Sequence, residues 1–112
     1  MTPAESALAF IERFCAGDVD GLEPLLTEDL HFSGPLFTFT SRASYLDSLR
    51  ADSLDPTPYT ILEVLTGTNS VAVFYILDKP TGDLTLAQLF RFEQDRIAAI
   101  LLVFDARLTQ SF

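Results

Sequence analysis

The last third of the chain contains two long apolar segments that are separated by a two-residue polar turn. Residues 84–93 (LTLAQLFRFE) precede Gln94 and Asp95, and residues 96–105 (RIAAILLVFD) follow them. Apolar runs bounded by polar turn residues are typical of β-strands, and so short a connection joins antiparallel neighbours. The sequence therefore predicts a C-terminal β-hairpin, which restricts the chain to folds that contain an antiparallel sheet.

Two further strands are predicted upstream of this hairpin. Residues 59–66 and 71–78 are rich in β-branched and aromatic side chains and are separated by Gly67-Thr68-Asn69. A second turn signal, Lys79-Pro80-Thr81-Gly82, separates them from the hairpin. Glycine, proline and asparagine favour the backbone angles of turns, so the second half of the chain is predicted to form an antiparallel meander.

The N-terminal residues predict a helix. Thr2 is followed by Pro3 and, three residues after the threonine, by Glu5, which is the pattern of a capping box with proline in the first turn. Apolar residues occupy most of the circumference of this segment until Gly17, a residue that commonly ends helices. We therefore expect a helix that packs deeply against the rest of the domain.

The segment between this helix and the meander predicts mixed structure. Residues 18–27 indicate a shorter helix, although Pro24 limits its regular part. Residues 30–33 and 37–40 indicate short strands, and Ser41 is expected to cap a further helix that ends before residues 55–58 (DPTP). The order of elements predicts a single α+β domain over residues 1–112, with N-terminal helices packed on a curved, mainly antiparallel sheet.

Both faces of the predicted sheet are apolar. Gln88 and the leucines and phenylalanines that alternate with it form one face, yet Ala87 and Leu89 on the other face are also apolar, as are residues 97–104 throughout. Three helices can cover only one face of the sheet. We therefore expect a second copy to cover the other face, in a homodimer formed through the sheet.

Composition excludes several classes of partner. The formal charge of −9 repels nucleic acid and anionic lipid surfaces, so neither is expected as a partner. One cysteine, Cys15, and one histidine, His31, are too few for an internal disulfide or a common zinc site, so no metal or cofactor is predicted. No export signal or membrane-spanning run is visible, and a cytoplasmic location is expected.

Several short motifs resemble the nuclear transport factor 2-like superfamily, which includes the SnoaL-like polyketide cyclases and ketosteroid isomerase. They are residues 16–22 (AGDVDGL), 27–35 (TEDLHFSGP) and 89–92 (LFRF), followed by Arg96-Ile97. The resemblance spans nearly the whole chain. It implies a cone-shaped α+β barrel in which a curved sheet wraps around a long helix and leaves a pocket open at one end.

The catalytic groups of ketosteroid isomerase have no equivalents at two of three matching positions. The resemblance aligns its base, its helical tyrosine and its protonated aspartic acid with Gly34, Phe10 and Gln88. Glycine cannot abstract a proton and a phenyl ring cannot donate a hydrogen bond, so isomerisation by that route is excluded. Gln88 retains an amide that can orient a carbonyl oxygen, although a buried glutamine bonded to a neighbouring side chain is an equally open interpretation.

The first functional hypothesis is that the cone binds a small, largely apolar molecule. Gln88 is predicted to be the polar contact, and the predicted walls are Phe10, Phe14, Phe32, Phe90, Leu102 and Phe104. The hydroxyls of Tyr45, Tyr59 and Tyr75 are further pocket candidates among which the sequence does not choose.

Two other hypotheses remain open. One is an acid/base enzyme of the cyclase, isomerase or dehydratase type that acts on a hydrophobic carbonyl compound, with Asp105 or His31 as catalytic residues. Strand alternation turns both side chains away from the pocket, because Phe104 and Phe32 are expected to face inward. The other is a non-catalytic dimerisation or interaction module whose cone is filled by its own ten phenylalanines.

Overall fold

The computed structural model describes residues 1–52 and 54–108. The elements follow one another in the order α1 (Pro3–Cys15), η1 (Asp20–Leu25), β1 (Leu26–Ser33), β2 (Thr38–Phe39), α2 (Arg42–Asp52), β3 (Tyr59–Gly67), β4 (Ser70–Lys79), β5 (Gly82–Glu93), β6 (Arg96–Val103) and η2 (Ala106–Leu108).

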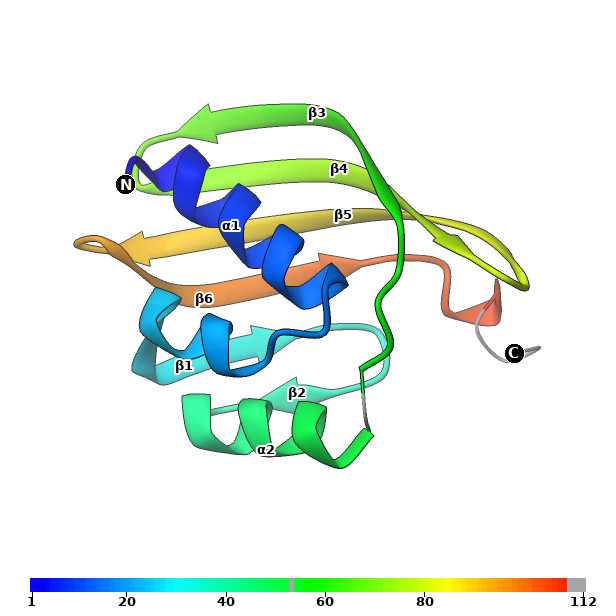
Figure 1. The fold of residues 1–112 in the computed structure, drawn as a ribbon. Helices are drawn as coiled ribbons and strands as arrows, with labels where there is room; N and C mark the ends of the chain where they lie inside the picture. The colour runs from blue at the N-terminus through cyan, green and yellow to red at the C-terminus, as the bar shows by residue number, and fades with distance from the viewer. Residues whose placement is uncertain (53, 109–112) are drawn as a thin grey trace.

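The strands form one six-stranded sheet in the order β2-β1-β6-β5-β4-β3. β1 runs parallel to β6, and all other neighbours are antiparallel. Figure 1 shows the sheet curving behind α1, with α2 beside β1 and β2. β2 and β3 are the two edges, so the sheet curves without closing. The predicted α+β fold, with helices packed on a curved and mainly antiparallel sheet, is confirmed.

The predicted first helix is confirmed, together with its cap. The Thr2 hydroxyl accepts a hydrogen bond from the Glu5 amide, and the Glu5 carboxylate accepts one from the Thr2 amide. Gly17 ends the turn after α1 with φ of +76°, and a Cβ there would lie 2.8 Å from the Leu54 carbonyl oxygen. Glycine is therefore required at this position both by its backbone angle and by the close passage of the chain that follows α2.

The region after α1 differs from its predicted form. The predicted helix at residues 18–27 is a 3₁₀ helix that ends at Leu25, and Leu26 already pairs with Ile97 in the sheet. Pro24 supplies no amide hydrogen, so the 3₁₀ turn does not extend into a regular α-helix. The predicted strand at residues 30–33 is consequently longer and begins at Leu26, because pairing with β6 stabilises extended backbone there.

The core lies between α1 and the inner face of β1 and β4–β6. Its largest fully buried side chains are Phe10, Phe90, Ile11, Leu22, Leu26, Leu30, Leu46, Ile97, Val71 and Val73. The prediction that both faces of the sheet are apolar is also confirmed, because a group of large apolar side chains on the opposite face is exposed. We call this group the outer strip: Leu65, Phe74, Leu101 and Val103. Within the described residues, none of the helices has the length and apolarity needed to cross a membrane.

Candidate functional site

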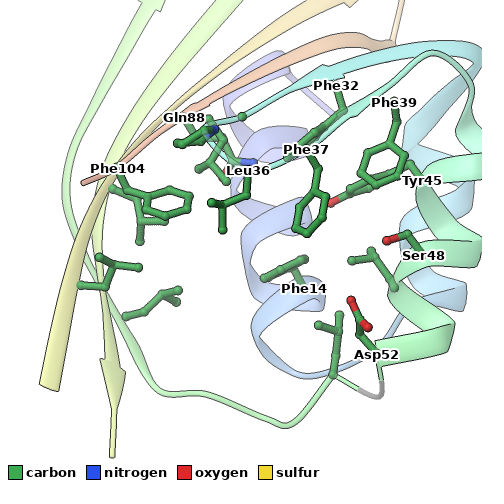
Figure 2. Close-up of a pocket in the computed structure, with 18 of the residues that line it drawn as sticks. Phe14, Phe32, Leu36, Phe37, Phe39, Tyr45, Ser48, Asp52, Gln88 and Phe104 are labelled. Carbon is green, nitrogen blue, oxygen red and sulfur yellow. The ribbon is translucent and has the colours of Figure 1, made fainter. Parts of the chain in front are cut away.

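A cavity of about 380 Å³ lies on the inner side of the sheet, between α1, α2 and the turn that joins β1 to β2 (Figure 2). β4, β5 and the segment after β6 complete its walls. Most of its lining is apolar, and aromatic rings contribute the largest share. The aromatic residues that line it are Phe10, Phe14, Phe32, Phe37, Phe39, Tyr45, Tyr75 and Phe104.

The ring of Tyr45 is held in place by three phenylalanines. It stacks on Phe32 at 4.8 Å between ring centroids, meets Phe39 edge-on at 5.6 Å, and lies 6.5 Å from Phe10. The helix that carries Tyr45 is positioned by Ser41, whose hydroxyl accepts a hydrogen bond from the Ser44 amide. Because the ring is enclosed on these sides, its orientation is set by packing.

The Tyr45 hydroxyl points into the cavity (Figure 2). The residue is only 3% exposed, and its hydroxyl makes no hydrogen bond to any residue within 1–52 or 54–108. Burial raises the pKa of Tyr45, and the proximity of Tyr75 raises it further. Tyr45 therefore stays protonated at neutral pH and offers a hydrogen-bond donor to the cavity.

A second buried polar group is formed by adjacent strands. The Tyr75 hydroxyl on β4 donates a hydrogen bond of 2.7 Å to the Gln88 side-chain carbonyl on β5. Both residues are 3% exposed, and both line the cavity. Burial raises the pKa of Tyr75, with a smaller contribution from Cys15, so this hydroxyl is neutral as well. Both interpretations of Gln88 hold in part: its carbonyl is bonded to a neighbour, and its side chain lines the cavity.

Among the described lining residues, only Asp52 and Lys79 carry a formal charge. Ser48 and Asp52 follow Tyr45 at intervals of three and four residues along the same side of α2, and Asp52 is exposed. Lys79 lies on β4, and Leu36 and Phe37 of the β1–β2 turn are exposed at the rim. The interior therefore presents apolar walls with neutral hydrogen-bonding groups.

Six of the seven residues predicted to bind a ligand line the cavity: Phe10, Phe14, Phe32, Gln88, Leu102 and Phe104. Phe90 is not among the lining residues. It is fully buried, and its ring packs against Phe10 with centroids 5.4 Å apart. Gln88 and Phe90 alternate onto the same face of β5, but α1 covers the position of Phe90, so this ring belongs to the core beneath the cavity.

Both predicted catalytic residues lie outside the cavity. His31 is exposed on the outer face, where it lines a separate hollow of about 170 Å³ together with Arg91. Asp105 is exposed beyond the end of β6 and is paired with Arg107, with 2.8 Å between Oδ2 and Nη2. The hydrogen bonds from Arg107 lower the pKa of Asp105. Neither residue lines the cavity, in agreement with the strand alternation.

Cys15 has a buried thiol that does not line the cavity. Burial raises the pKa of Cys15 to about 11, so it stays protonated at neutral pH. The described residues contain no group of three or more His, Cys, Asp or Glu side chains arranged to hold a metal ion.

Sequence reasoning did not select the two tyrosines that matter most to the cavity. The signal for Tyr75 was present, because it alternates with Val71, Val73 and Leu77, all of which face inward. Tyr45 precedes Leu46 on the apolar side of α2, so helical periodicity also indicated its burial. That both hydroxyls open into one cavity depends on the packing of α2 against β1.

Comparison with known proteins places these features in a family. The family model of the SnoaL-like domain matches residues 7–100. No curated protein matches the sequence significantly.

Several solved structures share the fold at low sequence identity. An NTF2-like protein of unknown function from Cytophaga hutchinsonii has a TM-score of 0.84 at 18% identity, covering 98% of this chain and 96% of that chain. A putative ketosteroid isomerase from Kribbella flavida has a TM-score of 0.81 at 17% identity, covering 92% and 77%. An LEH-like epoxide hydrolase from M. tuberculosis has a TM-score of 0.78 at 16% identity, covering 97% and 86%. At these identities the likeness establishes the fold alone.

Proposed function

We propose that this chain, which belongs to the SnoaL-like domain family, binds a small, largely apolar molecule in the cavity beneath α1 and α2. The observation that carries the proposal is the aromatic-walled cavity of about 380 Å³, whose volume lies in the range of small-molecule sites. Buried hydrogen-bonding groups converge on its apolar space, which is the usual composition of such sites.

The character of the lining defines the class of ligand. Removing apolar ligand surface from water is favourable in proportion to the area buried, so binding does not require a charged anchor. A charged ligand would lose its hydration inside this cavity, and only Asp52 and Lys79 of the described lining carry a formal charge. An uncharged aromatic or alicyclic molecule is therefore the best match, with affinity in the micromolar range once ordering costs are subtracted.

The placement of polar groups favours binding over the acid/base alternative. His31 and Asp105, the residues on which that alternative was based, lie outside the cavity. Tyr45 and Tyr75 have raised pKa values and act as donors, not as bases, near neutral pH. The existence of the cavity also argues against a cone filled by the chain's own phenylalanines.

We further propose that a second copy of the chain covers the outer strip. Leu65 and Leu101 belong to one row across the strands, and Phe74 and Val103 belong to the next. All four are between 39% and 53% exposed. The first row is apolar across four strands and the second across three, where Glu63 occupies the β3 position, so the strip is a contiguous apolar patch of the kind that marks an interface.

The charges around the outer strip support a partner of the same sequence. Exposed Arg91 borders one end of the strip, while Asp78 and Asp83 face each other in register at the other end. Ala87 lies midway between residues 83 and 91 along β5. A two-fold axis across the strands near Ala87 therefore brings the basic end of one copy opposite the acidic end of the other.

Filling the cavity tests the binding proposal. Ser48→Trp introduces an indole from the cavity side of α2, and the matched control Ala43→Trp introduces the same ring at an exposed position of the same helix. We expect wild type and Ala43→Trp to bind an environment-sensitive hydrophobic dye with similar affinity, and Ser48→Trp to bind it at least about tenfold more weakly, a loss of ~1.4 kcal/mol, because the indole occupies the cavity. Native mass spectrometry of each protein reports any co-purified molecule.

Two results would contradict the proposal. Dye binding that is equal in Ser48→Trp and Ala43→Trp would place the dye elsewhere on the protein. No binding by folded wild type, together with no co-purified mass, would indicate that the cavity does not accept apolar molecules.

A further inference from the structure

We infer that the hollow on the outer face of the sheet is a second binding site, which takes a small carboxylic acid with an apolar ring or chain. The carboxylate pairs with Arg91, and His31 lies on the opposite side of the hollow. The site is on the other side of the sheet from the aromatic cavity, and its occupation is independent of the binding proposed there.

The hollow results from one small side chain in a row of larger ones. Ala99 on β6 pairs with His31 on β1 at one side and with Arg91 on β5 at the other. Neighbouring strands lie about 4.8 Å apart, so the backbones of His31 and Arg91 are roughly 10 Å apart across Ala99. The methyl group of Ala99 fills little of that gap, and all three residues line the hollow of about 170 Å³.

The next row supplies apolar walls and a hydroxyl. Leu101 on β6 pairs with Ser33 on β1 and with Leu89 on β5, and all three line the hollow. A closed apolar cavity of about 150 Å³ is large enough to bind benzene, so a hollow of about 170 Å³ has room for one six-membered ring. The two leucines therefore offer contacts to the ring of a ligand whose carboxylate points towards Arg91.

Arg91 has no carboxylate partner in a chain that is rich in carboxylates. The chain has 16 acidic and seven basic residues, and three of the other arginines form ion pairs: Arg42, Arg50 and Arg107. The Arg91 side chain makes no ion pair or hydrogen bond with any residue within 1–52 or 54–108. Glu93, two residues further along β5, lies in register with Arg96 instead. The guanidinium of Arg91 is therefore available to an anion from solution.

The groups around the hollow favour a carboxylate over other charged groups. A guanidinium binds a carboxylate through two parallel hydrogen bonds, which are stronger than bonds between neutral groups. The Ser33 hydroxyl and the His31 imidazole are further donors on the β1 side. The net charge of −9 repels anions from the surface in general, so a carboxylate gains only where a basic side chain and apolar contacts coincide. An ammonium group would meet Arg91 as a like charge.

The hollow shares Leu101 with the outer strip. In the proposed dimer, Arg91 lies opposite the acidic end of the second copy, so a bound acid competes with that copy for the guanidinium. A ligand that binds only the monomer shifts the equilibrium towards monomers. The test therefore uses wild type and Phe74→Glu, a variant with a charge in the outer strip, in which no second copy should cover the hollow.

The experiment is a titration with benzoate that is followed by the amide NMR resonances of the protein. Two ligands with the same ring are compared with it: benzyl alcohol, which is uncharged, and benzylammonium, which has the opposite charge. We expect benzoate to shift the resonances of residues around the hollow with a dissociation constant about tenfold lower than that of benzyl alcohol, because only benzoate pairs with the guanidinium. Benzylammonium should shift none of them. Changes around the aromatic cavity report separately on binding there.

The variants separate the contribution of the charge from that of the space. Arg91→Gln removes an exposed guanidinium and should weaken benzoate binding at the hollow about tenfold, with little effect on benzyl alcohol. Ala99→Leu fills the hollow and should weaken both ligands there. Arg96→Gln is the matched control, because Arg96 is also exposed but does not line the hollow, and it should leave the affinity for benzoate unchanged.

Three results would overturn the inference. They are no shifts around the hollow in either wild type or Phe74→Glu, shifts that persist with unchanged affinity in Arg91→Gln, and equal affinity for acetate and benzoate, which would exclude the apolar contacts. None of these results affects the two proposals above, because dye binding by Ser48→Trp tests the aromatic cavity and sedimentation of the protein without benzoate tests the dimer.

Discussion

The inner and outer faces of the sheet carry similar apolar side chains, yet they differ in what covers them. On β5, Phe90 faces inward and is fully buried beneath α1, while on β4, Phe74 faces outward and is 39% exposed. The inner face also contains buried polar groups, whereas the polar groups of the outer face lie around its edges. The alternation of side chains along the strands shows that both faces are apolar. It does not show whether helices or another molecule cover each face.

The largest expected effect is the difference in stability loss between alanine substitutions of one phenylalanine on each face. Phe90→Ala removes a ring from a fully packed core and should lower the free energy of unfolding by about 3–5 kcal/mol. Phe74→Ala should lower it by less than about 1 kcal/mol at low protein concentration, because its ring is partly exposed in the monomer. Urea unfolding at two protein concentrations provides the measurement. Equal losses at low concentration would contradict the asymmetry between the two faces.

The second prediction concerns the cover of the outer strip. Phe74→Glu introduces a charge at the centre of the proposed interface, opposite Glu63 in register, and should convert a dimer into a folded monomer, since an unpaired buried charge is strongly unfavourable. Leu36→Glu is the control, because Leu36 is also exposed but lines the cavity on the other side of the sheet. Sedimentation of wild type and both variants measures the change. A monomeric wild type over the micromolar range would contradict the proposed dimer.

The smallest expected effect is a pH dependence that originates on the inner side. Cys15 has a folded pKa of about 11, above its ordinary value of 9.0, because burial disfavours the thiolate. Its contribution to stability is complete below the unfolded pKa and is lost as pH rises from about 9 to about 11. Urea midpoints should therefore fall across this window, and the fall should be shallower in Cys15→Ala. An identical slope in the two proteins would show that the thiol does not titrate with unfolding.

Much of the fold was predictable because its signals are local. The capping box of Thr2 and Glu5 defined the start of α1, and Gly17 marked its end. The turn at residues 94–95 joined β5 and β6 in the expected hairpin. The boundary between η1 and β1 was not predictable from the local pattern, because Leu26 becomes extended through pairing with Ile97, which is distant in sequence.

The candidate site was predictable in part for the same reason. Alternation correctly turned Gln88, Phe32 and Phe104 towards the interior and His31 and Asp105 away from it. Alternation did not separate Gln88 from Phe90, because both face inward and only the position of α1 decides which one borders empty space. The pairing of Tyr75 with Gln88 likewise depends on strand register, which sequence pattern alone does not define.

The sequence by itself determined the first helix, the meander, the two apolar faces and the acidic composition of this chain. These properties follow from side-chain chemistry and from periodicity within short segments. Only the tertiary structure decided that two tyrosines and a glutamine open into one aromatic cavity and that the outer strip has no cover within the described chain. The physical reason is that cavities and hydrogen-bond pairings depend on distances between segments far apart in sequence, which local patterns do not encode.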